Sequence, residues 1–149
     1  MTEEEIFNHL FEVAKTSKDK EGVVAACLVR DGEILAALPS SDDSKYHAEP
    51  EVIKKALSEG VVVKDDDILY STVEPCGKRT NMIDCSSYLI EKGIKNVCYA
   101  AIDPLQHEIA KGKLRKAGIY VRQTENKQIT EEARDIFNST MLNPKKYKI

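Results

Sequence analysis

Long apolar runs are missing from this chain of 149 residues. No stretch approaches the ~20 consecutive apolar residues of a transmembrane helix, and the first twenty residues lack the apolar centre of a signal peptide. Internal repeats, low-complexity tracts and linkers are also missing. We therefore expect one domain over residues 1–149, with a hydrophobic core of its own and a location in the cytosol.

The chain also lacks a net positive charge and has few aromatic residues. The formal net charge is −3, tryptophan is absent, and aromatic residues make up 6% of the chain. Nucleic-acid-binding grooves combine a basic surface with aromatic side chains on which bases stack, so this composition argues against one. Two short basic stretches, residues 111–116 and 145–148, are more typical of solvent-facing side chains than of a nucleic-acid contact.

The chain has only four cysteines, enough for two disulfides at most. A reducing compartment favours metal ligation over disulfides. Cys27 and Cys98 lie inside apolar runs, where a free cysteine is usually a small core residue. Cys76 follows Glu74-Pro75, and eight residues separate it from Cys85. Cys76 and Cys85 are therefore the candidate metal ligands.

Amphipathic helices alternate with short apolar strands along the chain. The pattern predicts helices over residues 3–16, 48–59, 85–92 and 106–117, and strands over residues 23–29, 33–38, 68–73, 96–102 and 119–123. A last helix should begin at Thr130, with Glu131 and Glu132 near its positive end. Asp31-Gly32 predicts a hairpin between the first two strands, and helical connections imply that the last three strands run parallel. The sequence thus predicts an α/β fold, a three-layer α/β/α sandwich around a mixed five-stranded sheet.

Three potential metal ligands and one carboxylate occur in a suggestive order: His47, Glu49, Cys76 and Cys85. A catalytic zinc ion takes three protein ligands and leaves its fourth position to a water molecule, whose pKa falls to about 7. One histidine and two cysteines supply the three ligands, and Glu49 is the candidate general acid and base. His-x-Glu followed by Pro-Cys-x-x-Cys is a known signature of zinc deaminases. Here, however, eight residues rather than two separate the cysteines.

The local structure predicted around these residues is compatible with one shared site. His47 and Glu49 can face the same metal only where the chain enters a helix. Pro50 fits such a junction, because proline is tolerated in a first turn and disfavours the α conformation for the preceding residue. Cys76 should lie at a strand end and Cys85 at a helix N-terminus, which stabilises a thiolate. Taken singly, His47 would more often be an ordinary histidine and Glu49 a surface carboxylate. The alternative that Cys76 and Cys85 are partly buried thiols without a role is disfavoured, because four matching residue types in order are more specific than either half.

These motifs resemble the cytidine-deaminase-like superfamily over nearly the whole chain. Thr72-Val73-Glu74-Pro75-Cys76, the eight-residue spacing to Cys85 and the Asp103-Pro104 pair look most like the pyrimidine deaminase of riboflavin biosynthesis. The resemblance implies a zinc enzyme that acts on a phosphorylated diaminopyrimidinone. It also implies a homodimer or larger homo-oligomer.

Five residues are candidates for substrate binding. Lys78 and Arg79 could contact phosphate, because cationic donors suit phosphate recognition; the alternative is a solvated loop tip. With Thr80 they resemble the Gly-Arg-Thr part of the family's loop, which here lacks Pro-Pro. Glu21 stands where the family carries an asparagine that helps to hold the pyrimidine. Ser40 begins a loop expected to overhang the pocket, although turn formation explains that loop equally well.

Several functions remain compatible with the sequence. The preferred one is the riboflavin-pathway pyrimidine deaminase. Its rivals are a deaminase of another nucleotide, nucleobase or specialised metabolite, a nucleic-acid deaminase, and a non-catalytic zinc-binding interaction module. Glu49 argues against the last, because a structural zinc site normally takes a fourth protein ligand instead.

Overall fold

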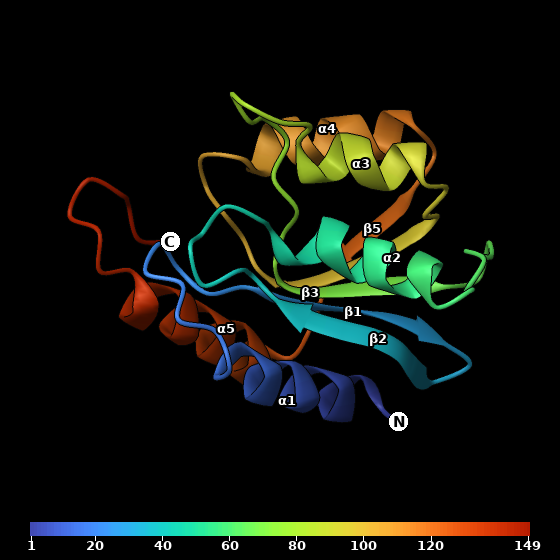
Figure 1. Cartoon of the computed structure of the whole chain (residues 1–149), viewed down its shortest axis with the longest axis horizontal. Helices are drawn as coiled ribbons and strands as arrows, with labels where there is room; N and C mark the ends of the chain where they lie inside the picture. Colours follow the sequence, from blue (N-terminus) through green and yellow to red (C-terminus); the bar gives the residue numbers. More distant parts are fainter.

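A computed structural model describes all residues, 1–149, as five helices around one five-stranded sheet (Figure 1). In chain order the elements are α1 (Glu3–Ala14), β1 (Ala25–Arg30), β2 (Glu33–Pro39), α2 (Ala48–Ser58), β3 (Ile68–Val73), α3 (Cys85–Glu91), β4 (Asn96–Ala101), α4 (His107–Lys116), β5 (Tyr120–Gln123) and α5 (Lys127–Thr140). The strand order is β2-β1-β3-β4-β5. Strands β3, β4 and β5 pair in parallel, whereas β1 is antiparallel to both of its neighbours. The predicted mixed sheet is confirmed.

Helices cover both faces of the sheet, which confirms the three layers. In Figure 1, α1 and α5 lie below the sheet and α2, α3 and α4 lie above it. The core under α1 includes Phe7, whose ring meets Tyr70 edge to face at 5.6 Å between centroids. Cys27 and Cys98 are completely buried in the same core, as the apolar runs around them predict. Apolar side chains from α2, α3 and α4 fill the core on the other face.

The topology brings the ends of four strands to one edge of the sheet. Since β3 and β4 are parallel, Glu74 and Asp103 both follow strand ends at this edge. Strand β1 runs the opposite way, so its start near Gly22 lies there too. The hairpin then returns the end of β2, and with it Ser40, to the same place. Loops that are distant in sequence therefore surround one site.

The hairpin between β1 and β2 forms as predicted. Asp31 and Gly32 have φ angles of 51° and 74°. Positive φ at both central positions is what a two-residue hairpin turn of the favoured hand requires.

The start of the last helix differs from the prediction. Helix α5 begins at Lys127 rather than Thr130, because the Asn126 side chain caps it by accepting hydrogen bonds from two backbone N–H groups. Residues 131 and 132 consequently fall beyond the first turn, so the predicted interaction of these glutamates with the helix dipole is wrong. The other elements end within two residues of their predicted limits.

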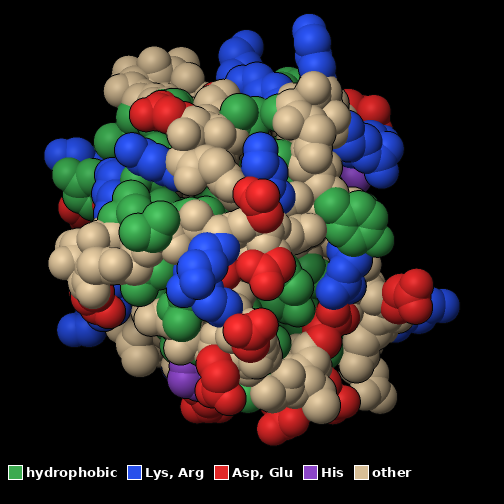
Figure 2. Space-filling view, turned by 90° about the vertical axis from the view of Figure 1, so that its right-hand side faces the viewer, with side chains coloured by type: hydrophobic (Ala, Val, Ile, Leu, Met, Phe, Trp, Pro, Cys, Tyr) green, Lys and Arg blue, Asp and Glu red, His purple; other side chains and the backbone are tan.

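Charges of both signs are interspersed on the face shown in Figure 2. Lysine and arginine side chains alternate there with carboxylates, so this face carries no continuous basic surface. No helix combines the length and the apolar character that crossing a membrane requires.

Candidate metal centre

The three predicted metal ligands converge. One ligand atom each from His47, Cys76 and Cys85 lies within 4.8 Å of the other two. His47 Nδ1 is 3.2 Å from Cys85 Sγ and 3.7 Å from Cys76 Sγ. Tetrahedral zinc with ordinary bond lengths places nitrogen and sulfur ligands about 3.6 Å apart. The donor set and its spacing therefore fit zinc.

The start of α2 supplies the histidine and the carboxylate. His47 is the N-cap residue in an extended conformation, and its side chain makes no capping hydrogen bond. Glu49 lies in the first turn, so both side chains can face the same site. The expectation that Pro50 keeps Glu49 out of the α conformation is wrong: both residues are helical. At this position the missing N–H of proline costs no hydrogen bond, because an N–H in the first turn has no acceptor within the helix.

Helix α3 supplies the second cysteine and fixes the first. Cys85 is its first residue, and Asp84 caps the helix by accepting a hydrogen bond from the Ser87 backbone. The Cys85 N–H points at Cys76 Sγ at 3.3 Å, and the next N–H donates to the Cys76 carbonyl at 3.0 Å. The helix N-terminus is thus directed at Cys76, where it favours a thiolate.

The pKa values of the two thiols are shifted in opposite directions. Hydrogen bonding from Cys85 and His47 lowers the pKa of Cys76 to about 5, although burial opposes the shift. Donation to Cys76, together with burial, raises the pKa of Cys85. Burial lowers the pKa of His47, but the Cys76 hydrogen bond and the Glu49 charge outweigh it and raise the value. Metal binding must therefore release protons from this cluster.

Glu49 is buried beside the ligands with only 3% of its surface exposed. Burial raises its pKa to about 7, while the charge of His47 opposes the rise. A carboxyl group with a pKa near neutrality can both accept and donate a proton at physiological pH.

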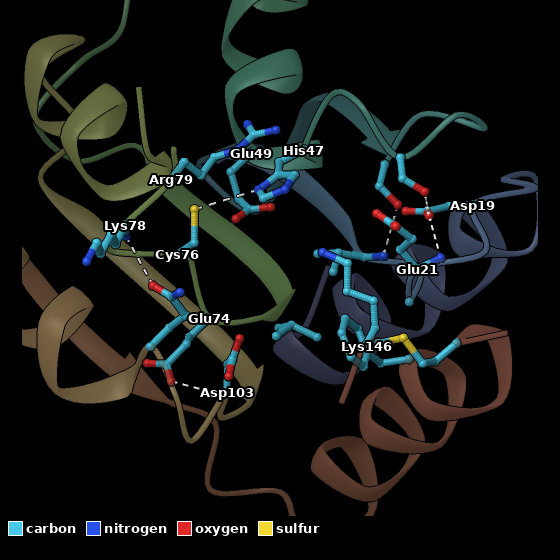
Figure 3. Close-up of a pocket in the computed structure, with 18 of the residues that line it drawn as sticks. Asp19, Glu21, His47, Glu49, Glu74, Cys76, Lys78, Arg79, Asp103 and Lys146 are labelled. Carbon is cyan, nitrogen blue, oxygen red and sulfur yellow. Dashed lines mark hydrogen bonds between the residues drawn. The ribbon is translucent and has the colours of Figure 1, made fainter. Parts of the chain in front are cut away.

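A cavity of about 430 Å³ opens over the site (Figure 3). His47, Glu49 and Cys76 line it, whereas Cys85 is buried behind them. All five candidate substrate-binding residues line the same cavity: Glu21, Ser40, Lys78, Arg79 and Thr80. The structure therefore brings together every residue that sequence reasoning placed at the site.

Three of these candidates already have partners within the protein. The Ser40 hydroxyl accepts a hydrogen bond from the backbone of Val24, 16 residues away, and so ties the end of β2 to the start of β1. Arg79 donates to the backbone carbonyl of Lys45 at 2.9 Å and so ties two cavity loops together. Glu21 accepts a hydrogen bond from the side chain of Asn143.

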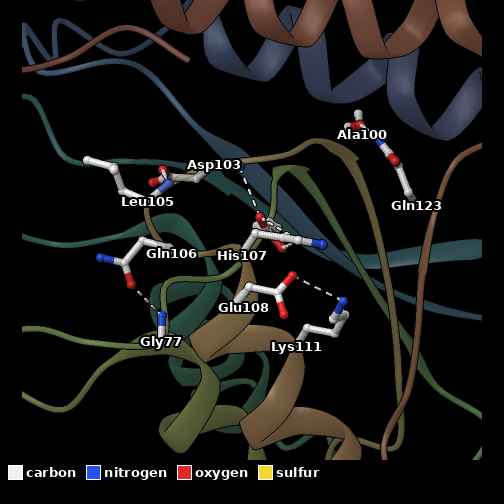
Figure 4. A network of polar contacts seen from close by, with 10 residues as sticks. Gly77, Ala100, Asp103, Leu105, Gln106, His107, Glu108, Lys111 and Gln123 are labelled. Carbon is white, nitrogen blue, oxygen red and sulfur yellow. Dashed lines mark hydrogen bonds and ion pairs between the residues drawn. The ribbon is translucent and has the colours of Figure 1, made fainter.

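Sequence reasoning missed a polar network behind Cys76 (Figure 4). Glu74 is buried and accepts hydrogen bonds from His107 Nδ1 at 2.9 Å and from the Asp103 backbone at 3.0 Å. Gln106 accepts from the backbone N–H groups of Gly77 and Lys78. The start of α4 therefore holds the loop that follows Cys76. The Asp103-Pro104 pair belongs only to the family resemblance, and no local pattern in the sequence indicated this contact.

The chain's last residues also form part of the cavity. Lys146 and Tyr147 line it together with Phe137 of α5 and Met141, the residue that follows α5. The basic stretch 145–148 is thus not merely solvent-facing: Lys146 remains exposed but borders the cavity.

Comparison with known proteins identifies this arrangement. The model of the cytidine and deoxycytidylate deaminase zinc-binding region matches residues 1–101. The chain belongs to this deaminase family. His47, Cys76 and Cys85 form its zinc site, and the chain is assigned to the zinc-dependent hydrolytic deaminases.

Individual proteins similar to this chain include proteins of riboflavin biosynthesis. The riboflavin biosynthesis protein RibD of Aquifex aeolicus is 35% identical over 100 residues, which are 66% of this chain and 27% of that protein. A diaminohydroxyphosphoribosylaminopyrimidine deaminase/reductase of Thermotoga maritima is 27% identical, with a TM-score of 0.74 over 90% of this chain and 38% of that one. The Rib2 deaminase of Aspergillus oryzae has a TM-score of 0.75 at 18% identity, covers 94% and 92% of the two chains, and shares the fold. The matched region spans about a quarter of the curated RibD relatives.

Proposed function

We propose that this deaminase hydrolyses the ring amine of a phosphorylated diaminopyrimidinone, an intermediate of riboflavin biosynthesis, and releases ammonia. The observation that carries the proposal is the eight-residue segment between the two zinc cysteines, which brings Lys78 and Arg79 to the cavity wall. Cationic donors in that position suit a phosphate ester. Sequence similarity to the RibD proteins supports the same substrate class.

Glu49 is the proposed catalytic residue. His47, Cys76 and Cys85 would hold a zinc ion, which would supply the Lewis acidity that makes water nucleophilic near neutral pH. Glu49, beside the ligands, would accept one proton of the attacking water and deliver it to a ring nitrogen. It would then take the proton of the newly added hydroxyl group and pass it to the departing amine, so that the hydroxyl oxygen becomes the ring carbonyl. Overall, water and the amine-bearing ring carbon yield a ring carbonyl and ammonia.

Substrate selection is assigned to the cavity wall. Lys78, Arg79 and Thr80 would contact the phosphate-bearing substituent, while Glu21 and Ser40 would lie near the ring or sugar. Because Arg79 and Ser40 also hold cavity loops together, their replacement should affect loop order as well as affinity.

The test is mass-spectrometric detection of amine-to-oxygen exchange by zinc-loaded protein. The panel contains the ribosyl and ribityl forms of the diaminopyrimidinone, each with and without phosphate, beside cytosine, cytidine, dCMP, adenine and guanine. We expect conversion of a phosphorylated diaminopyrimidinone, with Glu49→Gln as the inactive control. Conversion of another member of the panel, but of no diaminopyrimidinone, would refute the substrate and leave the deaminase.

Two further outcomes distinguish the remaining alternatives. Stoichiometric zinc without ammonia release from any compound would favour a non-catalytic zinc module. Exchange on single-stranded oligonucleotides would favour a nucleic-acid deaminase. The homo-oligomer and the cytosolic location stay predictions, and light scattering of the purified protein measures the first.

A further inference from the structure

Residues 142–149, here called the C-terminal loop, leave α5 and return to it (Figure 1). At the outgoing end, Met141 pairs with Glu21 in an isolated β-bridge, and the Leu142 N–H donates to the Lys20 carbonyl at 2.9 Å. At the returning end, the backbone of Ile149 and the side chain of Asn138 exchange two hydrogen bonds of 2.8 and 2.9 Å. Both ends of the loop are therefore fixed to the body of the protein.

Between these ends, the C-terminal loop is attached across the cavity. The Tyr147 hydroxyl lies 2.7 and 2.9 Å from the two carboxylate oxygens of Asp103, which follows β4. Burial and this hydrogen bond raise the pKa of Tyr147, so the phenol stays protonated and can donate. The contact joins the C-terminal loop to the segment that follows β4, on the other side of the cavity.

Lys146 precedes this attachment point and lines the cavity. Figure 3 shows its ammonium group directed into the cavity from the wall opposite Lys78. It forms no ion pair, although five carboxylates line the cavity: Asp19, Glu21, Glu49, Glu74 and Asp103. The ammonium is thus available to a ligand, and the neighbouring Tyr147 contact restricts its position.

We propose that Lys146 is a specificity-determining residue that binds an anionic substituent of the substrate, a phosphate ester, and that Tyr147 is the positioning residue that holds it at the cavity. The inference rests on the proposed function and adds a second wall to the phosphate site. An ammonium is a compact charge with three donors and can follow a phosphate without fixed geometry. A phosphate bound there would be contacted from the wall opposite Lys78 and Arg79.

The experiment compares Lys146→Gln with Lys148→Gln. Both lysines are exposed on the same loop, but only Lys146 lines the cavity. Steady-state kinetics are measured on the phosphorylated and dephosphorylated forms of the same diaminopyrimidinone. Lys146→Gln should raise KM for the phosphorylated form by about tenfold, the effect of losing one charge-assisted contact. Lys146→Gln should leave kcat, and KM for the dephosphorylated form, unchanged. Lys148→Gln should change KM for neither form.

Tyr147→Phe tests the positioning role. The substitution keeps the ring and removes the hydroxyl that contacts Asp103. KM for the phosphorylated form should therefore rise, as it does in Lys146→Gln. In the double variant with Lys146→Gln, this substitution should add little, because both act on one contact. Amide hydrogen exchange within residues 142–149 should also be faster in Tyr147→Phe.

The inference is overturned if Lys146→Gln behaves like Lys148→Gln, or if it weakens both forms of the substrate equally. A wild-type protein that converts no diaminopyrimidinone would overturn the proposed function instead. In that case calorimetric titration with inorganic phosphate still tests the loop. Weaker phosphate binding by Lys146→Gln, but not by Lys148→Gln, would support the role of Lys146. Equal phosphate binding by the two variants would refute it.

Discussion

Replacement of Gly77 by alanine should weaken zinc binding without altering any zinc ligand. A Cβ atom on this residue would lie 2.6 Å from the Ala110 backbone nitrogen and 2.7 Å from Ile109 Cγ2. Both atoms belong to α4, whose backbone cannot give way easily. The φ angle of Gly77 is not left-handed, so lack of space alone excludes a side chain here.

The structure also indicates the size of the effect. Relief of the closest contact to an ordinary separation requires a shift of about 0.9 Å. Gly77 directly follows Cys76, and zinc ligands tolerate distance errors of only about 0.2 Å. The shift would also stretch the bonds from the Gly77 and Lys78 N–H groups to Gln106, now 2.9 and 3.1 Å. Overpacking of this kind costs about 1–3 kcal/mol of stability. The part of this cost that only the zinc-bound state bears lowers zinc affinity, by at most about 150-fold.

Competition with a chromogenic chelator measures the zinc affinity, and urea unfolding measures stability. The matched control is Gly112→Ala. Gly112 lies within α4, and nothing lies within 4 Å of its Cβ position. Alanine there should stabilise the protein by about 0.5–1 kcal/mol, because glycine is unfavourable inside a helix. The reasoning fails if Gly77→Ala binds zinc as tightly as the wild type, or if the two substitutions change stability in the same direction.

Three further substitutions test other parts of the structure. Glu49→Gln should lower kcat by about 10²–10⁴-fold while metal analysis still finds one zinc per chain; more than a tenth of wild-type turnover would exclude Glu49 as the proton carrier. Asp67→Asn should cost about 2–4 kcal/mol in urea unfolding at pH 7, because it breaks a bidentate ion pair with Arg30 in which the Asp67 side chain is fully buried. Hydrogen bonds from Arg30 lower the pKa of Asp67 in the folded protein. The stability that Asp67 contributes is therefore present above its unfolded-state pKa of about 3.9 and is lost as the pH falls through the lower folded value. The free energies of unfolding of the wild type and Asp67→Asn should converge in acid, and a difference that stays constant with pH would contradict this linkage. Asn126→Ala should cost about 1 kcal/mol through loss of the α5 cap, whereas Asn126→Ser should restore most of it; equal stability of the two variants would refute the capping role.

The zinc site was predictable because its residues combine a short motif with recognisable strand and helix ends. His47 precedes a helix, Cys76 follows a strand, and Cys85 begins a helix, and each of these boundaries carries a local signal. Residue chemistry then limits what three such ligands can bind. The cap at Asn126 carried the same kind of signal, and only the choice of Thr130 as the helix start was wrong.

The C-terminal loop and the polar network around Glu74 were not predictable, because their contacts join loops that are distant in sequence. Tyr147 and Asp103 are separated by 44 positions, and His107 and Glu74 by 33. Each of these side chains is ordinary in its local context. Which loops meet depends on the strand order, and periodicity did not show that β1 lies antiparallel beside β3.

The two outermost strands of the sheet affect how the protein behaves at high concentration. An unpaired strand edge offers N–H and C=O groups to another chain and can start aggregation. Here β5 has only four residues, and Arg122 within it is paired with Glu3. At the other edge, β2 ends at a proline and its pairing with β1 contains a register shift. Both edges are therefore poor templates for strand addition, and concentrated samples should resist edge-to-edge aggregation even when zinc is limiting.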